Sequence, residues 1–569
     1  MRSGAVGTYD GILFSGIHMA RFTRSVNMTS STDMRALTFF VVLTVALAQQ
    51  GLSAPLTNAQ TSNIAAREGQ SEFEQILSDP SLQLVFPRSL DWPRLRTFYA
   101  MRHGEPAWTG SDTARENAMH ARAVLASASD HGLDAIYDVV GAVEMPAGTT
   151  TPFATELILT DRLLRYVQDV SRGRVQPDST DPDRALPLQS FDAVPALAAA
   201  LTQGQLKDFL THVPPPYPGY ERLAGALARY REIAAQGGWP TILPGKGEIE
   251  WDGSDERLAL LRKRLNAEDV EIGGDTIDDL QRAVLRYQAR NGLVADGRVG
   301  PKTLGMLNVP VTDRIAQIVA NMERWRWLPR KFEDLYIFVQ LPDGVLRVMD
   351  NGHVALESKV IFGRPHDPTP VLRAEATSIT VNPPWNVPRT IAVSEILPLL
   401  RRHSDYLVRH NMVLLNGPVG DPYGQTIDWT TVTARNFRYR VQQLPGPDNA
   451  LDRLKLEMPN RFVVYLHDTP HRSLFSASDR ALSHGCVRVE QILPLASFAL
   501  TGDVNSAQSM LQGTIATEKT TRIDLPAPLP VYLLYWTAIA DADGLIGFRP
   551  DIYQRDKRLT EKLARSDAS

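Results

Sequence analysis

The chain has 569 residues, of which 43% are hydrophobic and 22% charged, and its formal net charge is −4. This length predicts about two to four domains, and the lack of a basic surplus argues against nucleic acid as a partner. A single cysteine, Cys486, excludes an internal disulfide and a cysteine-rich zinc site. Cys486 is left as a buried spectator, a redox thiol or a catalytic thiolate.

The N-terminal region carries the pattern of an export signal. Arg21, Arg24 and Arg35 precede an apolar run at 36–48, whose thirteen residues suit a signal-peptide core and are short for a membrane span of about 20 residues. We predict that residues 1–48 form a signal peptide, or alternatively an uncleaved N-terminal anchor, and that the rest of the chain is exported. No later stretch of the sequence approaches a membrane span.

A polar stretch without periodicity, 49–70, is expected to be a linker. From 71 to 245 the apolar residues recur with helical spacing. The clearest run, 221–236, places Leu223 and Leu227 on one stripe between a proline cluster and two glycines. We predict a helical scaffold domain over 71–245.

Residues 250–310 carry two amphipathic runs, 257–265 and 276–291, which predict helices. A turn and a third helix, which starts at a Gly-Pro pair, are expected to follow. This order resembles the small three-helix peptidoglycan-binding module, and the resemblance implies such a module at 250–310. Whether the module binds glycan or serves as a spacer stays open. The shared features are Tyr287-Gln288, Gly292-Leu293, Asp296-Gly297 and Gly300-Pro301-Lys302-Thr303.

Residues 330–510 are rich in short runs of β-branched and aromatic residues, which predict a mainly antiparallel β-sheet. Asp343-Gly344 and Asn351-Gly352 are predicted to be two-residue hairpin turns. The fold class is therefore α+β and multidomain, with a helical scaffold, a three-helix module and a sheet domain. The expected strands are 336–341, 345–349, 354–361, 378–381 and 462–466.

Two further segments are expected around this sheet. Residues 399–447 interrupt the strand pattern with a helix-like stretch and several turns. We interpret them as a lid insertion over a substrate groove, with a bland surface insertion as the alternative. Residues 511–569 are expected to pack on the sheet domain as a C-terminal segment.

Cys486 follows His467 by nineteen positions, and His467 is expected at the end of a strand. A thiol becomes a strong nucleophile when a base or a positive charge lowers its pKa from about 8.5. His467, His484 and Arg488 qualify by residue type. Gly485 has no side chain, so a substrate carbonyl can approach the backbone amides of Gly485 and Cys486, a candidate oxyanion hole. The cysteine lies in the run Ser483-His484-Gly485-Cys486.

The spacing of these residues resembles the signature of the L,D-transpeptidase catalytic domain, in which a histidine precedes a Ser/Thr-His-Gly-Cys run. Here fifteen residues lie between His467 and Ser483. The exported chain as a whole resembles the large multidomain periplasmic L,D-transpeptidases of Gram-negative bacteria, with their helical scaffold and peptidoglycan-binding module. Asp468 and Arg488 stand where many members have Gly and Asn. Further matches to the catalytic domain are 362–365, 382–388 and 467–470.

The resemblance implies a transferase mechanism with peptidoglycan stem peptides as donor and acceptor. Cys486 would attack the bond between the L-centre of a diamino acid and the terminal D-alanine of a tetrapeptide stem. His467 would move the thiol proton to the departing D-alanine, and the amides of Gly485 and Cys486 would hold the oxyanion. The side-chain amine of a second stem would resolve the thioester into a 3-3 cross-link. Water or a free D-amino acid as acceptor would give carboxypeptidase or exchange activity, and carbapenems are expected to acylate the thiol.

Several residues are assigned supporting roles. The family usually orients the catalytic histidine through the carbonyl of the next residue, here Asp468, and the Asp468 side chain is an alternative orienter. His484 is a second base or a structural hydrogen bonder. Arg488 is expected to pair with a stem carboxylate or to stabilise the thiolate loop, with a salt bridge that fixes the fold as the alternative. Ser483 is taken as a supporting residue of the same loop.

Three residues are candidates for lining the substrate groove. Tyr465 lies two residues before His467 and hence on the same strand face, where it lines the pocket or packs the sheet. Trp385 and Asn386 lie in a proline-rich loop and are expected to wall the groove, with core packing as the alternative for Trp385. No metal, nucleotide or other cofactor is expected, because no ligand or phosphate-loop pattern is present in the sequence.

Two other functional classes are weighed against the transpeptidase. Papain-like peptidases generally place cysteine before histidine in the chain, the reverse of the order here. A non-catalytic wall-binding protein would have no need of His467 and Cys486. The expected location is the periplasm, with possible anchoring in the inner membrane, and wall-synthesis enzymes are further candidate partners.

Overall fold

The computed structural model describes residues 73–567, except 85, 87–88, 134–136, 138–152, 178–183, 189, 246 and 269–271. The described residues belong to one compact unit that spans Gln70–Ser569. The expected export signal at 1–48 and the linker at 49–70 lie outside them. Among the helices of the described ranges, none has the length and apolar character needed to cross a membrane.

The N-terminal part of the described chain is helical, as expected. Its helices pack around buried aromatic and aliphatic side chains such as Phe98, Tyr99 and Leu163. The helix expected at 221–236 is α8, which begins at Pro218. The helices are α2 (Pro80–Gln83), α3 (Trp92–Met101), α4 (Asp112–Ala126), α5 (Ala154–Arg172), α6 (Ala193–Thr202), α7 (Leu206–His212) and α8 (Pro218–Ala235).

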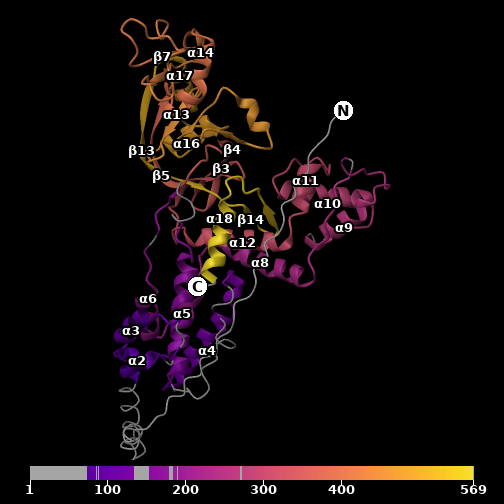
Figure 1. The fold of residues 1–569 in the computed structure, drawn as a ribbon, viewed down its shortest axis with the longest axis vertical. Coiled ribbons are helices and arrows are strands. Elements are labelled where there is room, and N and C mark those ends of the chain that lie inside the picture. Colours follow the sequence, from indigo (N-terminus) through magenta and orange to yellow (C-terminus); the bar gives the residue numbers. More distant parts are fainter. Residues whose placement is uncertain are drawn as a thin grey trace, which may run out of the picture. The chain divides into compact units, whose positions relative to one another are not determined.

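A three-helix module follows, with α9 (Arg257–Glu268), α10 (Ile277–Arg290) and α11 (Pro301–Leu307) close together (Figure 1). Thr276 and Asp279 form a capping box that starts α10. The buried Gln288 side chain accepts from the Gly297 amide at 2.8 Å and donates to the Arg298 carbonyl at 2.9 Å. These two bonds fold the Asp-Gly turn back onto α10. The next helix, α12 (Val311–Arg326), packs against α8.

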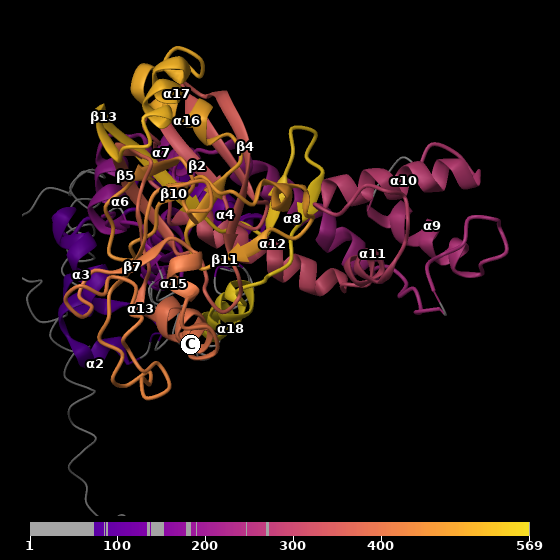
Figure 2. The ribbon, with the colours of Figure 1, turned by 90° about the horizontal axis from the view of Figure 1, so that it is seen from above.

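Eight strands close into a mixed β-barrel, because β9 pairs with both β10 and β5. The β13–β2 and β10–β12 pairs are parallel and the other six are antiparallel. The prediction of mainly antiparallel pairing is confirmed, and the sheet closes on itself. Figure 2 shows β2, β4, β5 and β10 of this barrel from above. In ring order the strands are β5 (Val371–Val381), β13 (Thr521–Leu534), β2 (Leu335–Gln340), β3 (Val345–Asp350), β4 (His353–Gly363), β12 (Val487–Val489), β10 (Leu466–His467) and β9 (Leu454–Glu457).

The C-terminal segment 511–569 contributes an integral strand to this barrel. β13 lies between β5 and β2, and its register against β5 shifts between Asp524 and Leu529. Such a bulge bends a long strand and helps a sheet to close. Two short strands join the ring from outside: β1 (Arg184–Ala185) pairs with β5, and β11 (Ala481–Ser483) pairs with β4.

Two local predictions in the barrel require correction. Asn351-Gly352 is a two-residue turn with both residues at positive φ, but Gln340 pairs with Val345 and leaves a four-residue loop around Asp343-Gly344. The loop is longer because the Leu341 amide pairs with Leu534 of β13.

The strand expected at 462–466 is wrong for most of its length. The Asn460 side chain accepts from the amides of Phe462 (3.1 Å) and Val464 (3.2 Å), which fixes a turn there. Val463 has a φ of +56° in this turn, so only Leu466 of the expected run belongs to a strand.

The insertion predicted at 399–447 begins earlier, at Trp385, and has a core of its own. Buried side chains of Leu397, Leu407, Trp429 and Phe437 fill it. Its elements are β6 (Trp385–Asn386), α13 (Arg389–Ile391), the π-helical η3 (Ala392–Ile396), α14 (Leu397–Arg402), α15 (Tyr406–Arg409), β7 (Met412–Leu414) and β8 (Val441–Gln443). The remaining elements are η1 (Ala128–His131), η4 (Arg472–Ser476), α16 (Ile492–Thr501), α17 (Gln508–Ala516), the hairpin β14 (Ala538–Ala540) and β15 (Ile546–Phe548), and α18 (Arg555–Asp567).

Candidate active site

The parallel pairing of β10 and β12 brings the predicted catalytic residues together. His467 is the register partner of Arg488, and the Val487 amide donates to the Tyr465 carbonyl at 3.1 Å. Side chains two positions apart on a strand share a face, and paired residues of parallel strands point the same way. Tyr465, His467, Cys486 and Arg488 therefore lie on one face, at neighbouring strand ends.

His467 is held as a neutral base. It is 5% exposed, and its Nδ1 lies 2.5 Å from the carbonyl oxygen of Asp468. A carbonyl only accepts, so Nδ1 carries the proton and Nε2 is the basic nitrogen. Burial, followed by the positive charge of Arg488, lowers the pKa of His467 to about 3. The imidazole is therefore neutral at neutral pH.

The Cys486 thiol is half-buried, with Sγ 3.9 Å from the carbonyl oxygen of Val463. Burial raises the pKa of Cys486 above its usual value, and interactions with Tyr465, Lys455 and Arg488 oppose this shift only in part. Burial of the thiol thus outweighs the positive charges that the sequence places near it. The Cys486 thiol and the His467 imidazole are therefore both neutral at neutral pH.

The nucleophile loop is clamped by its own serine. Ser483 Oγ accepts from the Gly485 amide at 3.1 Å and donates to the Cys486 carbonyl at 2.5 Å. Gly485 has a φ of +108°, which favours glycine. The Gly485 amide, predicted to be half of an oxyanion hole, is thus already engaged. The hydrogen bonds of the described residues include none from the Cys486 amide, which leaves it as the available donor.

Asp468 and His484 make contacts away from the reacting atoms. The Asp468 carboxylate accepts from the Thr469 amide (2.9 Å) and from Arg472 (3.0 Å), so its carbonyl and not its side chain contacts the imidazole. His484 Nε2 lies 2.6 Å from Glu395 of η3. His484 therefore links the nucleophile loop to the insertion, in agreement with its structural alternative.

Arg488 has a buried Nε without a hydrogen-bond partner in the described structure, and burial lowers the pKa of its guanidinium. The salt bridges of the described residues include none to Arg488, so the alternative of a fold-fixing ion pair is not observed. Its guanidinium is suited to a carboxylate from outside the chain.

The predicted groove residues divide into two groups. The Tyr465 ring centroid lies 5.5 Å from that of His467, and burial raises the pKa of Tyr465, with a further contribution from Cys486. Trp385 packs in part against the core of the insertion. Asn386 is exposed and accepts from Gln442 at 2.8 Å. Tyr465 thus lies beside the thiol, whereas Asn386 bonds within the small sheet of the insertion.

Two residues near the thiol were not predicted from the sequence to belong to the site. Lys455 pairs with His467 across β9 and β10, and its Nζ lies 4.0 Å from the Tyr465 ring centroid. The alternation of apolar and charged residues at 454–457 was a usable signal for its strand. Val463 is 75% exposed and left-handed, a conformation that a β-branched residue rarely adopts. No pattern in the sequence predicts this left-handed conformation of Val463.

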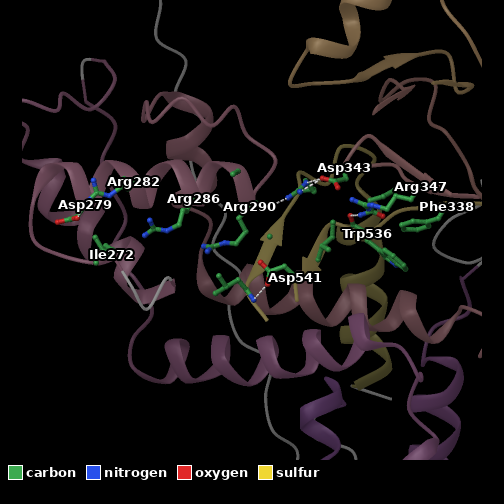
Figure 3. A pocket seen from close by; sticks show the side chains of 17 residues that line it. Ile272, Asp279, Arg282, Arg286, Arg290, Phe338, Asp343, Arg347, Trp536 and Asp541 are labelled. Carbon is green, nitrogen blue, oxygen red and sulfur yellow. Dashed lines mark hydrogen bonds and ion pairs between the residues drawn. The ribbon is translucent and has the colours of Figure 1, made fainter. Parts of the chain in front are cut away.

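A cavity of about 980 Å³ lies elsewhere in the molecule (Figure 3). The arginines of α10 line one side of it, and neither His467 nor Cys486 borders it. Arg282 pairs with Asp279 and Arg549 with Asp343, so these cations are already balanced. Within the described ranges no group of His, Cys, Asp and Glu is arranged to hold a metal ion.

Comparison with protein families identifies three regions of the chain. Residues 93–227 match the family described as "Scaffold domain", 254–307 match "Putative peptidoglycan binding domain", and 334–509 match "L,D-transpeptidase catalytic domain". The last of these contains every site residue described above.

A relative from Haemophilus influenzae, named "Putative L,D-transpeptidase", is 36% identical over 251 residues. The alignment covers 44% of this chain and 49% of the relative, so the chain spans about half the length of this relative. The L,D-transpeptidase structure from Xylanimonas cellulosilytica is 17% identical, with a TM-score of 0.16, over 52% of this chain and 98% of that one. The Ldtfm-avibactam carbamoyl enzyme is 12% identical, with a TM-score of 0.18, over 45% and 80%.

Proposed function

Because the chain belongs to the L,D-transpeptidase family and carries scaffold, peptidoglycan-binding and catalytic domains, we propose that it forms 3-3 cross-links in peptidoglycan through a thioester on Cys486. The observation that carries this proposal is the shared strand face of His467 and Cys486, with the imidazole fixed as a neutral base. A nucleophile and a base on one face are the minimum needed for acyl transfer through a thioester.

The first half-reaction releases D-alanine. The Cys486 sulfur attacks the carbonyl carbon that joins the L-centre of the donor's diamino acid to D-alanine. His467 Nε2 takes the thiol proton as the C–S bond forms and gives it to the amine as the C–N bond breaks. The raised pKa of Cys486 and the neutral His467 favour proton transfer during attack over a preformed ion pair. The Cys486 amide donates a hydrogen bond to the oxyanion.

The second half-reaction uses the same groups. The side-chain amine of a second stem attacks the thioester carbonyl, His467 takes the amine proton, and the thiol is regenerated as the cross-link forms. Arg488, whose Nε has no hydrogen-bond partner among the described residues, binds a stem carboxylate, and Tyr465 lines the site beside the thiol. A carbapenem is expected to acylate the same sulfur.

The insertion at 385–443 acts as a lid over this site. Support comes from the contact of Glu395 in η3 with His484, the residue two positions before the nucleophile. Arg364 also bonds Glu395, at 3.0 Å, and this pair ties the insertion to the barrel. Hydrogen exchange of 385–443 is expected to slow when Cys486 is acylated. Exchange that is unchanged on acylation would leave the segment a surface insertion.

The setting is the cell wall outside the cytoplasm, namely the periplasm. Peptidoglycan is the substrate, and the module at 254–307 brings the enzyme to it. Wall-synthesis enzymes are candidate partners of the scaffold domain at 93–227. No nucleic acid or cofactor enters the scheme.

The test incubates the purified protein with disaccharide-tetrapeptides and identifies the products by mass spectrometry. The wild type is expected to release D-alanine and to form cross-linked dimer, and Cys486→Ala and His467→Ala are expected to form none. His471→Ala, a change of an exposed histidine after β10, is the matched control and is expected to keep activity. Tripeptide as the sole product would assign a carboxypeptidase instead, and an active Cys486→Ala would overturn the mechanism.

A further inference from the structure

Thr369 is a fully buried residue in the loop after β4, with 0% exposure. Its Oγ1 lies 2.8 Å from the Gly363 amide and 2.8 Å from the Gly485 carbonyl oxygen. An amide only donates, so the hydroxyl accepts from Gly363 and its own proton points to Gly485. Thr369 therefore forms a hydrogen bond to the nucleophile loop one residue before Cys486.

The Gly485 carbonyl and the Cys486 amide belong to one peptide unit. No cis peptide bond is present among the described residues, so this unit is trans and its C=O and N–H point in opposite directions. A hydroxyl that fixes the carbonyl on one side fixes the direction of the amide on the other. The neighbouring Gly485 amide and Cys486 carbonyl are both held by Ser483. The Cys486 N–H is the donor that remains.

Thr369 is itself held by the C-terminal segment. The Tyr553 hydroxyl accepts from the Thr369 amide at 3.2 Å and donates to the Gly363 carbonyl, and Arg555 donates to the Thr369 carbonyl at 3.2 Å. Gly363 allows the loop to return this closely, because a Cβ there would lie 2.1 Å from the Asp367 carbonyl oxygen. A continuous set of bonds thus links β4, the C-terminal segment and the nucleophile loop.

We propose that Thr369 is a positioning residue that aims the Cys486 amide at the oxyanion of the acyl-transfer transition state. The inference rests on the proposed function, since it concerns the geometry of that reaction. Loss of one oxyanion donor in an acyl-transfer enzyme typically costs about 10²–10³ in rate. A donor that is kept but loosened is expected to cost less, about tenfold to a hundredfold.

The test compares turnover with simple alkylation of the same thiol. Thr369→Val keeps the shape and removes the hydroxyl, and it is expected to lower kcat for D-alanine release by about tenfold or more. Alkylation of Cys486 by iodoacetamide forms no oxyanion, so its rate is expected to stay within about twofold. Thr369→Ser restores the hydroxyl and should restore turnover. Thr537→Val is the matched control, because Thr537 is also fully buried and its hydroxyl bonds Asn321 and Asp556.

Normal turnover in Thr369→Val would overturn the inference, and so would equal losses of turnover and alkylation, which indicate a collapsed loop. If Thr369→Val does not fold, Tyr553→Phe gives the decision, because it removes one bond to Thr369 and keeps the ring. It is expected to lower turnover with alkylation unchanged, and unchanged turnover would count against the network. A wild type that releases no D-alanine and yet alkylates normally is a failure of the proposed function, and is distinguishable from these outcomes.

Discussion

Nδ1 of His467 lies 2.5 Å from the carbonyl oxygen of Asp468, the residue that follows it in the chain. The contact is made by the backbone, so the tautomer of the imidazole does not depend on which side chain stands at 468. The Asp468 carboxylate is free to serve another purpose, and it bonds Thr469 and Arg472 instead.

Asp468→Asn is expected to leave turnover within about twofold and to change the pH dependence of stability. Burial, followed by Asp452, raises the pKa of Asp468 to about 6, from about 3.9 in an unfolded chain. Between these values the native state binds more protons than the unfolded state, so the wild type loses stability as pH rises from 4 to 6.

The neutral asparagine lacks this dependence. The free energy of unfolding of both proteins is measured by urea at pH 4 and pH 7. The difference between Asp468→Asn and the wild type should shift in favour of the variant by up to about 3 kcal/mol from pH 4 to pH 7. A difference that does not vary with pH would contradict the raised pKa. A hundredfold loss of turnover would show that the Asp468 side chain orients the His467 imidazole.

The rate of acylation is expected to be flat between about pH 5 and pH 8, because His467 is neutral above its pKa of about 3 and the thiol stays protonated. Iodoacetamide should alkylate Cys486 more slowly than free cysteine at pH 7, and its rate should rise with pH. Stopped-flow acylation and timed alkylation across this range check both statements. An acid limb near pH 6.5 would show that His467 keeps the usual pKa of a histidine, and alkylation faster than that of free cysteine would indicate a preformed thiolate.

Arg488→Gln is expected to raise KM for a tetrapeptide donor by about tenfold or more, since a hydrogen bond to a charged group contributes about 1.5–3 kcal/mol. Its melting temperature should not fall, because the buried Nε has no partner to lose. Arg522→Gln, at an exposed pair with Asp524, is the control and should change neither quantity. An unchanged KM together with a lower melting temperature would assign Arg488 a structural role.

Val463→Gly is expected to stabilise the fold by about 1 kcal/mol, because it relieves a left-handed β-branched residue whose side chain is mostly exposed. Val354→Gly is the matched control, since Val354 is also exposed but lies within β4. It should destabilise by about 0.5–1 kcal/mol. Urea unfolding of both variants gives the comparison. Destabilisation by Val463→Gly would show that the side chain supports the turn beside the thiol.

The sequence predicted the local elements whose signals are local. The helix expected at 276–291 is α10, and Asn351-Gly352 closes its hairpin as expected, because amphipathic periodicity and two-residue turns depend on nearby residues in the chain. The closure of the barrel could not be predicted from the sequence. β13 pairs with β2 across nearly the whole catalytic region, and alternation within a strand does not name its partner.

The residues of the candidate site were named from the sequence, but their burial and hydrogen bonds were not. The spacing of His467 and Cys486 pointed to the pair, but the pKa of the thiol depends on burial by distant segments. The capture of the Gly485 amide by Ser483 depends on side-chain rotation, which spacing does not reveal. Thr369 gave no signal, because its role arises from a contact across more than a hundred positions.

A stem peptide held as a thioester on Cys486 can be detected by intact-mass spectrometry of the full-length protein, quenched in acid soon after it is mixed with a tetrapeptide donor. We expect a mass increase equal to the tripeptide acyl group, mapped to Cys486, with release of D-alanine and no adduct on Cys486→Ala. Release of D-alanine by Cys486→Ala, or an adduct that persists in that variant, would contradict this expectation.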